Sequence, residues 1–346
     1  MITKKSYKES SLFWSWGAFV LLSINFFTGV LIAQQANLIE SLFSIFLGFI
    51  ILSVSIFPVV HISVSDSLNY SQAISKYINI NILRKVLILL VPIINIGWYS
   101  IQVAIVVSLL NSISIFSIEY SVVISIAISF LFSSGSFLFG YKWLQYFGAV
   151  AMVLLILTFG YSSIQYNWSF NLASQTLNFG IILKATLLVI GSWIFSSVTC
   201  LMDITNYVKN SNKAFIYVIS ALFLADILLI SMGFLAAKVH SLDSMEKFLS
   251  ISGNIVLISS MIVSIWSTND SNFFSTMKAL EAFRVNKYYI YFGVSVISGT
   301  IASIGHDNLF QLLGKWLILM GWIGIPLSVF WWSMFIKDKI HRSIKT

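Results

Sequence analysis

The sequence predicts an all-α polytopic membrane protein with ten transmembrane helices. Of its 346 residues, 58% are hydrophobic and 9% are charged, whereas soluble domains carry roughly 25% charged residues. A soluble core could not bury this much apolar surface, so we expect the surrounding solvent to be lipid. Apolar runs of the roughly 20 residues that a spanning helix needs occur at 14–35, 39–62, 84–110, 119–139, 142–163, 180–202, 213–237, 249–274, 287–305 and 313–336.

Basic residues indicate how these spans are oriented. With the N-terminus placed inside, 16 of the 20 Lys and Arg residues fall on the inner side, and the four outside are Lys184, Lys238, Lys247 and Lys315. This positive-inside bias predicts a single transmembrane domain over 14–336 in the cell membrane, with cytoplasmic tails at 1–13 and 337–346. Because topology accounts for the net charge of +8, we expect the lipid bilayer and no nucleic acid as a partner.

The ten spans divide into two halves of five, at about 14–163 and 180–336. With an odd number of spans in each half, the second half enters the membrane from the opposite side. This geometry is typical of the inverted repeats found in many secondary transporters. The sequence shows no obvious internal repeat, so the expectation depends on the number of spans.

The eighth span contains an unusual polar run, SIWSTNDSNFF at 264–274. Hydroxyl and amide residues here share one face of an α-helix, namely Ser264, Ser267, Thr268, Ser271, Asn272 and Ser275. Asn269 and Asp270 lie on either side of this stripe. Hydroxyl groups can hold helices together, but this many polar groups in hydrocarbon favours a cavity or an ion site.

The third span contains PIINIGWYSIQ, in which Asn95, Trp98 and Gln102 share one helical face. Trp98 lies too deep for the interfacial belt where tryptophan usually occurs. A buried tryptophan beside amides suits stacking on a flat, polar ligand. Core packing, with the amides bonding between helices, is an equal alternative.

The sixth and first spans, at corresponding positions of the two halves, are both interrupted. In the sixth, Gly191 and a polar run would tolerate a broken helix around Trp193, with Ser192, Ser196, Ser197, Thr199 and Asp203 as the polar residues. In the first, the interrupting residues are Asn25, Thr28, Gly29, Gln34 and Gln35. Paired interruptions predict a binding site near the middle of the membrane.

Other reactive residues give weaker signals. Asp226 is a lone carboxylate within the seventh span, either a proton relay or an acid kept neutral by burial. Cys200 is the only cysteine, which excludes an intramolecular disulfide and a cysteine-based zinc cluster. No two histidines have metal-ligand spacing, and neither a phosphate-binding glycine loop nor a nucleophile elbow occurs. We therefore expect no enzyme and no cofactor.

Three segments together resemble the nucleobase:cation symporter family, most closely its cytosine-permease branch. They are IWSTND at 265–270, NIGW at 95–98, and GSWI at 191–194 followed by Asp203. TGVLIA at 28–33 is also similar to the hydroxymethylpyrimidine transporters of that family. The resemblance implies a LeuT-type five-plus-five inverted repeat with helices 1 and 6 interrupted. It also implies sodium-coupled import of a pyrimidine-type nucleobase or related flat heterocycle by alternating access.

The resemblance also implies roles for single residues. Trp98 and Trp193 would stack on the two faces of the base, and polar substrate contacts are expected from Asn95, Ser192, Ser264, Asn269 and Gln102. Sodium, the coupling ion, would bind the hydroxyls of Ser267 and Thr268 and the backbone carbonyls of Ser264, Phe27 and Val30. Oxygen ligands of this kind suit a hard cation.

Position 264 departs from the family pattern, and several alternatives stay open. Cytosine permease has asparagine where this chain has Ser264, and one hydroxyl cannot replace an amide, so a different substrate is expected. The alternatives are proton coupling through Asp226 or Asp270, import of a thiamine-precursor pyrimidine, and a ligand sensor that does not transport. We expect the protein to function as a monomer.

Overall fold

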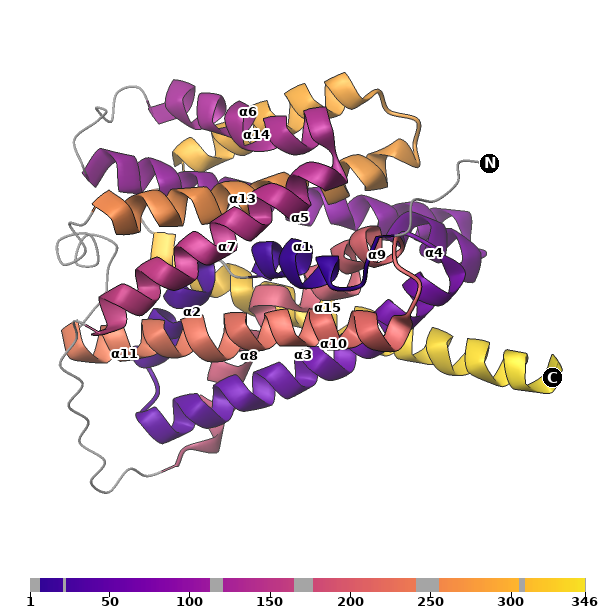
Figure 1. Cartoon of the computed structure of the whole chain (residues 1–346), viewed down its shortest axis with the longest axis horizontal. Helices are drawn as coiled ribbons and strands as arrows, with labels where there is room; N and C mark the ends of the chain where they lie inside the picture. The colour runs from indigo at the N-terminus through magenta and orange to yellow at the C-terminus, as the bar shows by residue number, and fades with distance from the viewer. Residues whose placement is uncertain are drawn as a thin grey trace.

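The computed structural model describes residues 7–20, 23–112, 121–164, 177–240, 255–304 and 309–345, and these residues form helices and no strand. Most helices run roughly along one direction and form a bundle, with both chain termini at the same end (Figure 1). We call this end the termini end. The predicted tail residues 1–6 and 346, and Lys247, lie outside the described residues.

Each predicted span corresponds to one or more helices of the bundle. The first half comprises α1 (Ser11–Val20) with α2 (Ser23–Ala33), α3 (Leu38–Asp66), α5 (Asn81–Ser112), α6 (Ser121–Phe139) and α7 (Tyr141–Ile164). The second half comprises α8 (Phe179–Val198) with α9 (Cys200–Thr205), α10 (Ser211–Phe223) with η2 (Leu224–Ile230) and α11 (Ser231–His240), α13 (Ile255–Glu281), α14 (Lys287–Ile304) and α15 (Leu309–Lys345).

Length and composition alone identify fewer spans than the fold contains. Among the described residues, seven helices are long and apolar enough to cross a membrane, or eight if the bent pair α1 and α2 is one span. α13 is not among them, because its polar stripe offsets its apolar residues. The structure also adds the short helix α4 (Tyr70–Tyr77) and continues α15 as a helix through the predicted tail to Lys345.

The first and sixth spans are both broken, the sixth within the predicted polar run and the first upstream of the predicted residues. α1 and α2 meet at a 49° bend after Val20, upstream of the predicted residues. Asn25 bridges this bend, because its amide donates to the Val20 carbonyl at 3.1 Å. The sixth span breaks at Thr199, whose backbone (φ −127°, ψ −76°) leaves the helical region. The Trp331 indole donates to the Val198 carbonyl at 2.8 Å there, so the break remains hydrogen-bonded.

Gly191 has a different role from the predicted one. It lies inside α8, and a Cβ atom at this position would be 1.8 Å from the backbone oxygen of Leu317 in α15. The first span uses the same device, since a Cβ on Gly29 would be 2.0 Å from the Ile230 oxygen. Glycine therefore lets helix backbones approach closely at these interfaces, as is common in membrane bundles.

The helices pack into two groups. The first group contains α1, α2, α3 and the helices α8 to α11, and the second contains α5, α6, α13 and α14. In Figure 1 the second group occupies the upper part of the bundle and most of the first group lies below it. α7 packs on both α1 and α13, so it lies between the groups. The candidate site residues come from both groups.

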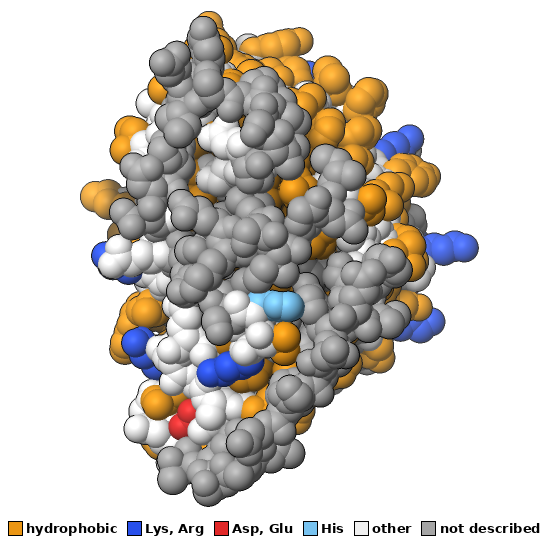
Figure 2. Space-filling model, turned by 90° about the vertical axis from the view of Figure 1, so that its left-hand side faces the viewer, with side chains coloured by type: hydrophobic (Ala, Val, Ile, Leu, Met, Phe, Trp, Pro, Cys, Tyr) orange, Lys and Arg blue, Asp and Glu red, His pale blue; other side chains and the backbone are white. Residues whose placement is uncertain are grey.

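Apolar side chains cover the flanks of the bundle. Leu42, Phe46, Leu157, Phe292 and Trp322 are examples of large side chains that are more than 40% exposed. Figure 2 views the end opposite the termini, where hydrophobic side chains extend along the flanks, with several Lys and Arg side chains among them. An apolar exterior of this kind requires lipid as its solvent.

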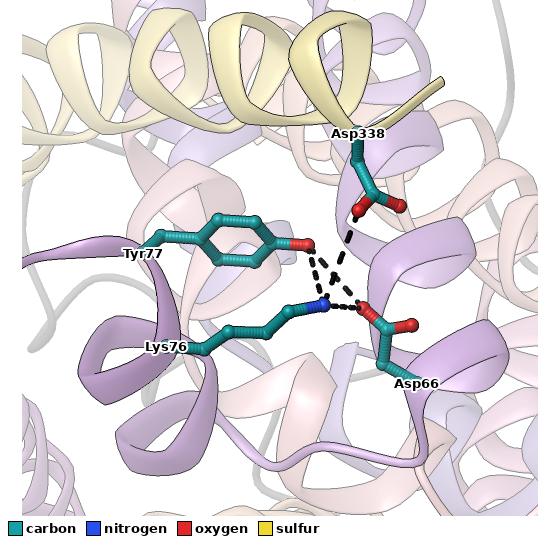
Figure 3. A network of polar contacts seen from close by, with 4 residues as sticks. All are labelled: Asp66, Lys76, Tyr77 and Asp338. Carbon is teal, nitrogen blue, oxygen red and sulfur yellow. Dashed lines mark hydrogen bonds and ion pairs between the residues drawn. The ribbon is translucent and has the colours of Figure 1, made fainter. Parts of the chain in front are cut away.

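A polar network at the termini end joins α3, α4 and α15 (Figure 3). The Lys76 ammonium lies 2.6 Å from the Asp66 carboxylate and 4.0 Å from that of Asp338, and it donates to the Tyr77 hydroxyl at 3.3 Å. Burial lowers the pKa of Lys76, but the bonds to Asp66 and Tyr77 outweigh this effect and raise the pKa. Lys76 therefore stays charged at neutral pH.

Candidate functional site

The polar stripe of α13 is buried inside the bundle. All six stripe residues, and Asn269 and Asp270 beside them, are at most 8% exposed. α13 packs against α5, α6 and α7 and also contacts α1. Because the stripe lies in the membrane interior, its polar atoms need partners within the protein or a bound ligand.

Thr268 lies where α13 meets the broken first span. Its hydroxyl is 3.2 Å from the Phe19 carbonyl oxygen and 3.4 Å from that of Ala18. The carbonyl of Ser264, one turn earlier in α13, is 3.3 Å away. Three carbonyl oxygens and one hydroxyl therefore converge here, and we call these four atoms the oxygen cluster.

The carbonyls near Thr268 are not those that the sequence analysis named. Phe27 and Val30 lie inside α2, and the Val30 carbonyl accepts from the backbone amide of Gln34 at 3.3 Å. The bend after Val20 instead leaves carbonyls near the end of α1 without a continuing helix. Phe27 and Val30 therefore stay a prediction as ion ligands, while the carbonyls of Ala18 and Phe19 are the ones within 3.4 Å of the Thr268 hydroxyl.

The other hydroxyls of the stripe lie next to the oxygen cluster. Ser267 faces α7, where a Cβ on Gly148 would be 3.5 Å from its hydroxyl. The Ser264 hydroxyl donates to the Met261 carbonyl at 2.9 Å. The Ser271 hydroxyl donates to the Ser267 carbonyl at 3.1 Å. Bonds within the helix thus engage Ser264 and Ser271.

The structure brings the first and sixth spans together through their polar residues. The Trp193 indole donates to the Asn25 amide oxygen at 2.8 Å, and its ring packs against Phe19, with 5.8 Å between centroids. The hydroxyls of Ser192 and Thr28 lie 3.2 Å apart. Corresponding positions in the two halves thus meet in the interior.

Asn95 is occupied by contacts within the protein. Its amide nitrogen donates to the Asn272 carbonyl at 3.1 Å and to the Thr276 hydroxyl at 3.2 Å. The Cys200 thiol, next to the break in the sixth span, lies 3.7 Å from both its amide nitrogen and its amide oxygen. Asn95 therefore connects α5 to α13 and to the break.

Trp98 packs against a tryptophan that the sequence analysis did not identify. The rings of Trp98 and Trp316 meet edge to face, with 6.2 Å between centroids. Gly97 makes room for this contact, because a Cβ there would be 2.3 Å from the Trp316 ring. Trp98 is 4% exposed, and among the described residues its ring makes no contact with that of Trp193.

Two buried amide side chains, on α13 and α5, have unused hydrogen-bonding capacity. Asn269 is fully buried, and neither its amide oxygen nor its amide nitrogen has a partner among the described residues. The same holds for the side-chain oxygen of Gln102, one helical turn beyond Trp98 on α5. A buried polar atom without a partner is costly, and it is the kind of group that a polar ligand satisfies.

Asp270 is held by three donors from the α6–α7 hairpin. The backbone amide and hydroxyl of Ser136 donate to one carboxylate oxygen at 2.8 and 2.7 Å. The Trp143 indole donates to the other oxygen at 2.7 Å. Gly135 leaves space for this indole, since a Cβ there would be 2.1 Å from its nitrogen. Asp270 thus attaches α13 to the hairpin.

Asp226, unlike Asp270, has no hydrogen-bond donor for its carboxylate among the described residues. It lies in the π-helical segment η2, is fully buried, and both carboxylate oxygens lack a partner among the described residues. η2 packs against α2, α3, α10 and α11. Among the described residues, no group of three His, Cys, Asp or Glu side chains could hold a metal ion, so Asp226 is not part of such a cluster.

Two solved structures share the fold of this chain. Mhp1, a nucleobase-cation-symport-1 family transporter in a closed conformation with bromovinylhydantoin bound, aligns with a TM-score of 0.71 over 92% of this chain and 75% of its own, at 15% identity. The substrate-bound, outward-open state of a Na⁺-coupled sialic acid symporter aligns with a TM-score of 0.62 over 94% of this chain and 78% of its own, at 13% identity. No protein-family profile and no curated protein matches the sequence.

These alignments confirm the predicted architecture, a LeuT-type fold of ten spans with helices 1 and 6 interrupted. Both matched proteins are transporters and neither is an enzyme, which agrees with the sequence prediction. At these identities the alignments describe the fold, so the substrate and the ion have to be argued from the residues of this chain.

Proposed function

We propose that this protein is a sodium-coupled importer of a pyrimidine-type nucleobase or a related flat heterocycle, and that it belongs to the nucleobase:cation symporter family. It functions as a monomer in the cell membrane with the termini end facing the cytoplasm, in agreement with the distribution of Lys and Arg. The oxygen cluster at Thr268 carries this proposal. It joins α13, from one helix group, to the broken first span, from the other.

The chemistry of the oxygen cluster suits sodium. Hard cations prefer neutral or anionic oxygen ligands, and the cluster offers three carbonyls and a hydroxyl, with the Ser267 hydroxyl adjacent in sequence. A bound cation would hold α1 against α13. Sodium binding would thereby bias the relative position of the two helix groups, which is the requirement for coupling ion binding to alternating access.

The residues around Trp98 support a flat, polar substrate. Trp98 can stack on a ring, and Gln102 and Asn269 have unused amide atoms that can pair with its polar edge. Bromovinylhydantoin, the ligand in the Mhp1 structure, is itself a compound with a flat, polar ring. Trp193 and Ser192 complete the substrate site from the sixth span. Asn95 and Ser264 keep their internal bonds and shape the site.

A thermal-shift screen of nucleobases and pyrimidine precursors, with and without sodium, tests this proposal. A ligand that binds only the native state raises the apparent melting temperature by mass action, so the true substrate should give a larger shift when sodium is present. Trp98→Ala should remove the substrate shift, whereas Trp322→Ala, which truncates a 64% exposed tryptophan, should keep it. Sodium-independent uptake of the identified ligand at the full rate would contradict the ion assignment.

Proton coupling through Asp226 is the second candidate, because this carboxyl is fully buried without a partner. Charged groups are rare in such surroundings unless they serve transport. In that case Asp226→Asn should abolish the pH dependence of uptake while leaving ligand binding intact. An unchanged pH dependence would remove Asp226 from the mechanism. Asp270 is less suited to this role, because three donors hold its carboxylate.

A sensor with the same fold would bind the ligand without moving it. Proteoliposomes distinguish the two activities, because they report flux under an imposed sodium gradient. Ligand binding in detergent together with no flux under the gradient would favour the sensor, and gradient-driven accumulation would exclude it.

A further inference from the structure

A small cavity lies between the candidate cation site and the termini end. Its volume is about 10 Å³, roughly enough for one water molecule. Hydroxyl groups come from Ser15, Ser271 and Ser275, and aromatic rings from Trp16, Phe19 and Phe274. Cys200 also lines it. The walls thus offer both polar atoms and flat apolar surfaces.

Two residues of the cavity wall contact the oxygen cluster or the residue next to it. Phe19 lines the cavity, and its carbonyl oxygen is the one 3.2 Å from the Thr268 hydroxyl. Ser271 also lines it and bonds the Ser267 carbonyl. Since α13 runs from Ile255 toward Glu281, the lining residues Ser271 and Ser275 lie beyond Thr268 along this helix, toward its C-terminal end.

Three tyrosines from separate parts of the chain meet beside this cavity, and we call them the tyrosine cluster. Tyr141 stacks on Tyr207 with 5.0 Å between ring centroids, and Tyr7 packs edge-on against Tyr141 at 5.1 Å. Tyr7 comes from the segment before α1, Tyr141 begins α7, and Tyr207 follows α9. All three thus lie near helix ends at the termini end.

Tyr141 connects the tyrosine cluster to the cavity wall. Its hydroxyl lies 3.2 Å from that of Ser15, and its ring is 6.4 Å from that of Phe274. Both of these residues line the cavity, as does Leu144, one turn after Tyr141. Tyr141 is 7% exposed, so its ring is a buried contact of the cavity wall.

The tyrosine cluster also bridges the two helix groups. Tyr7 and Tyr207 belong to the first group and are tied together, because the Tyr7 amide donates to the Tyr207 carbonyl at 3.1 Å. The Glu9 side chain adds a second bond between these segments, because it accepts from the backbone amide of Asn210 at 3.0 Å. Tyr141 begins α7, which packs on α1 of the first group and on α13 of the second, and Asp270 attaches the α6–α7 hairpin to α13.

We propose that the cavity is the closed beginning of the release pathway toward the termini end, and that Tyr7, Tyr141 and Tyr207 form its gate. The proposal deepens the transport function and depends on it. When the helix groups move apart, the rings separate, the cavity widens, and the cation and a flat heterocycle leave past the hydroxyl and aromatic side chains of its wall.

Cys200 provides a direct test, because it is the only cysteine in the chain and it lines the cavity. A membrane-impermeant methanethiosulfonate reagent is applied to inside-out membrane vesicles, and modification of Cys200 is followed by mass spectrometry, with Cys200→Ala as the background. Tyr141→Ala should accelerate modification by about tenfold, on the scale of the ring contacts that it removes. The reagent applied to right-side-out vesicles should give no acceleration.

Two further variants keep the test decisive. Tyr7→Ala removes a gate ring from a segment outside the helices and should accelerate modification even if Tyr141→Ala folds poorly. Tyr291→Ala is the matched control, because Tyr291 makes comparable ring contacts with Phe137 in the other helix group and should leave the rate unchanged. Native rates in both gate variants, or equal acceleration in the control, would overturn the proposal.

The readout separates the gate from the proposed function. Cys200 modification requires neither substrate nor flux, so a faster rate without any transport would support a gated cavity and contradict the transporter. Sodium-driven uptake with unchanged Cys200 modification in both gate variants would support the transporter and contradict the gate.

Discussion

Thr268→Val tests the sodium site with little change of shape. The substitution removes the hydroxyl that lies 3.2 to 3.4 Å from the carbonyls of Ala18, Phe19 and Ser264 and replaces it with a methyl group. For the loss of one neutral oxygen ligand from the ion we take the scale of a hydrogen bond to a charged group, roughly 1.5–3 kcal/mol. At about 1.4 kcal/mol per factor of ten, the sodium concentration for half-maximal uptake should rise roughly 10- to 150-fold.

The assay is a sodium titration of tracer uptake in proteoliposomes, with choline replacing sodium at constant ionic strength. Thr186→Val is the matched control, because Thr186 is also buried and, within the described part of the chain, its hydroxyl bonds only the Ile182 carbonyl of its own helix. A sodium-dependent thermal shift measured without substrate shows whether the ion site itself is affected. Native sodium dependence in Thr268→Val would refute the assignment of the oxygen cluster.

Three other substitutions test the packing of the bundle by thermal unfolding in detergent. Gly191→Ala should destabilise by about 3 kcal/mol because its Cβ meets the Leu317 backbone, whereas Gly293→Ala, with open space around it, should be neutral or slightly stabilising. Asp270→Asn should lower the free energy of unfolding by about 1–3 kcal/mol, because its amide nitrogen would face a hydrogen-bond donor. Full native stability would contradict the role of Asp270 in attaching α13 to the hairpin. Lys76→Met should lower the free energy of unfolding by only about 0.2–1 kcal/mol. Because the pKa of Lys76 is raised, this contribution should persist at neutral pH and disappear only as the pH rises through the pKa of Lys76 in the folded protein.

The number and order of the spans could be predicted from sequence because lipid imposes a minimum apolar length on each helix. The position of the breaks was harder to predict. The first span bends after Val20, in an apolar stretch whose sequence does not indicate a break. The polar residue associated with the bend, Asn25, lies downstream of it and bonds back to the Val20 carbonyl. In the sixth span the hydroxyl run was a correct indicator, but the break occurs at Thr199, and Gly191 serves helix packing instead.

The helical stripes predicted which residues share a face, but not what they contact. Asn95 and Asp270 looked like site residues because both are polar and deep in the membrane. Their partners, such as Thr276 and Trp143, are distant in sequence or on other helices, and a single sequence does not specify these pairings. For the same reason, Trp316 and the tyrosine cluster escaped notice, since aromatic residues are common throughout this chain.

Hydrogen bonding divides the polar residues of the interior into two kinds. Asp270 and Asn95 have their polar groups engaged by protein donors and acceptors, so they hold helices in place and have little capacity left for a ligand. Asn269, Gln102 and Asp226 retain buried atoms without partners among the described residues, at an energetic cost that folding alone does not justify. A transporter must leave such groups unsatisfied in order to bind and release its cargo. We therefore propose substrate contacts for Asn269 and Gln102 and ion coupling for the oxygen cluster, with Asp226 as the alternative coupling group.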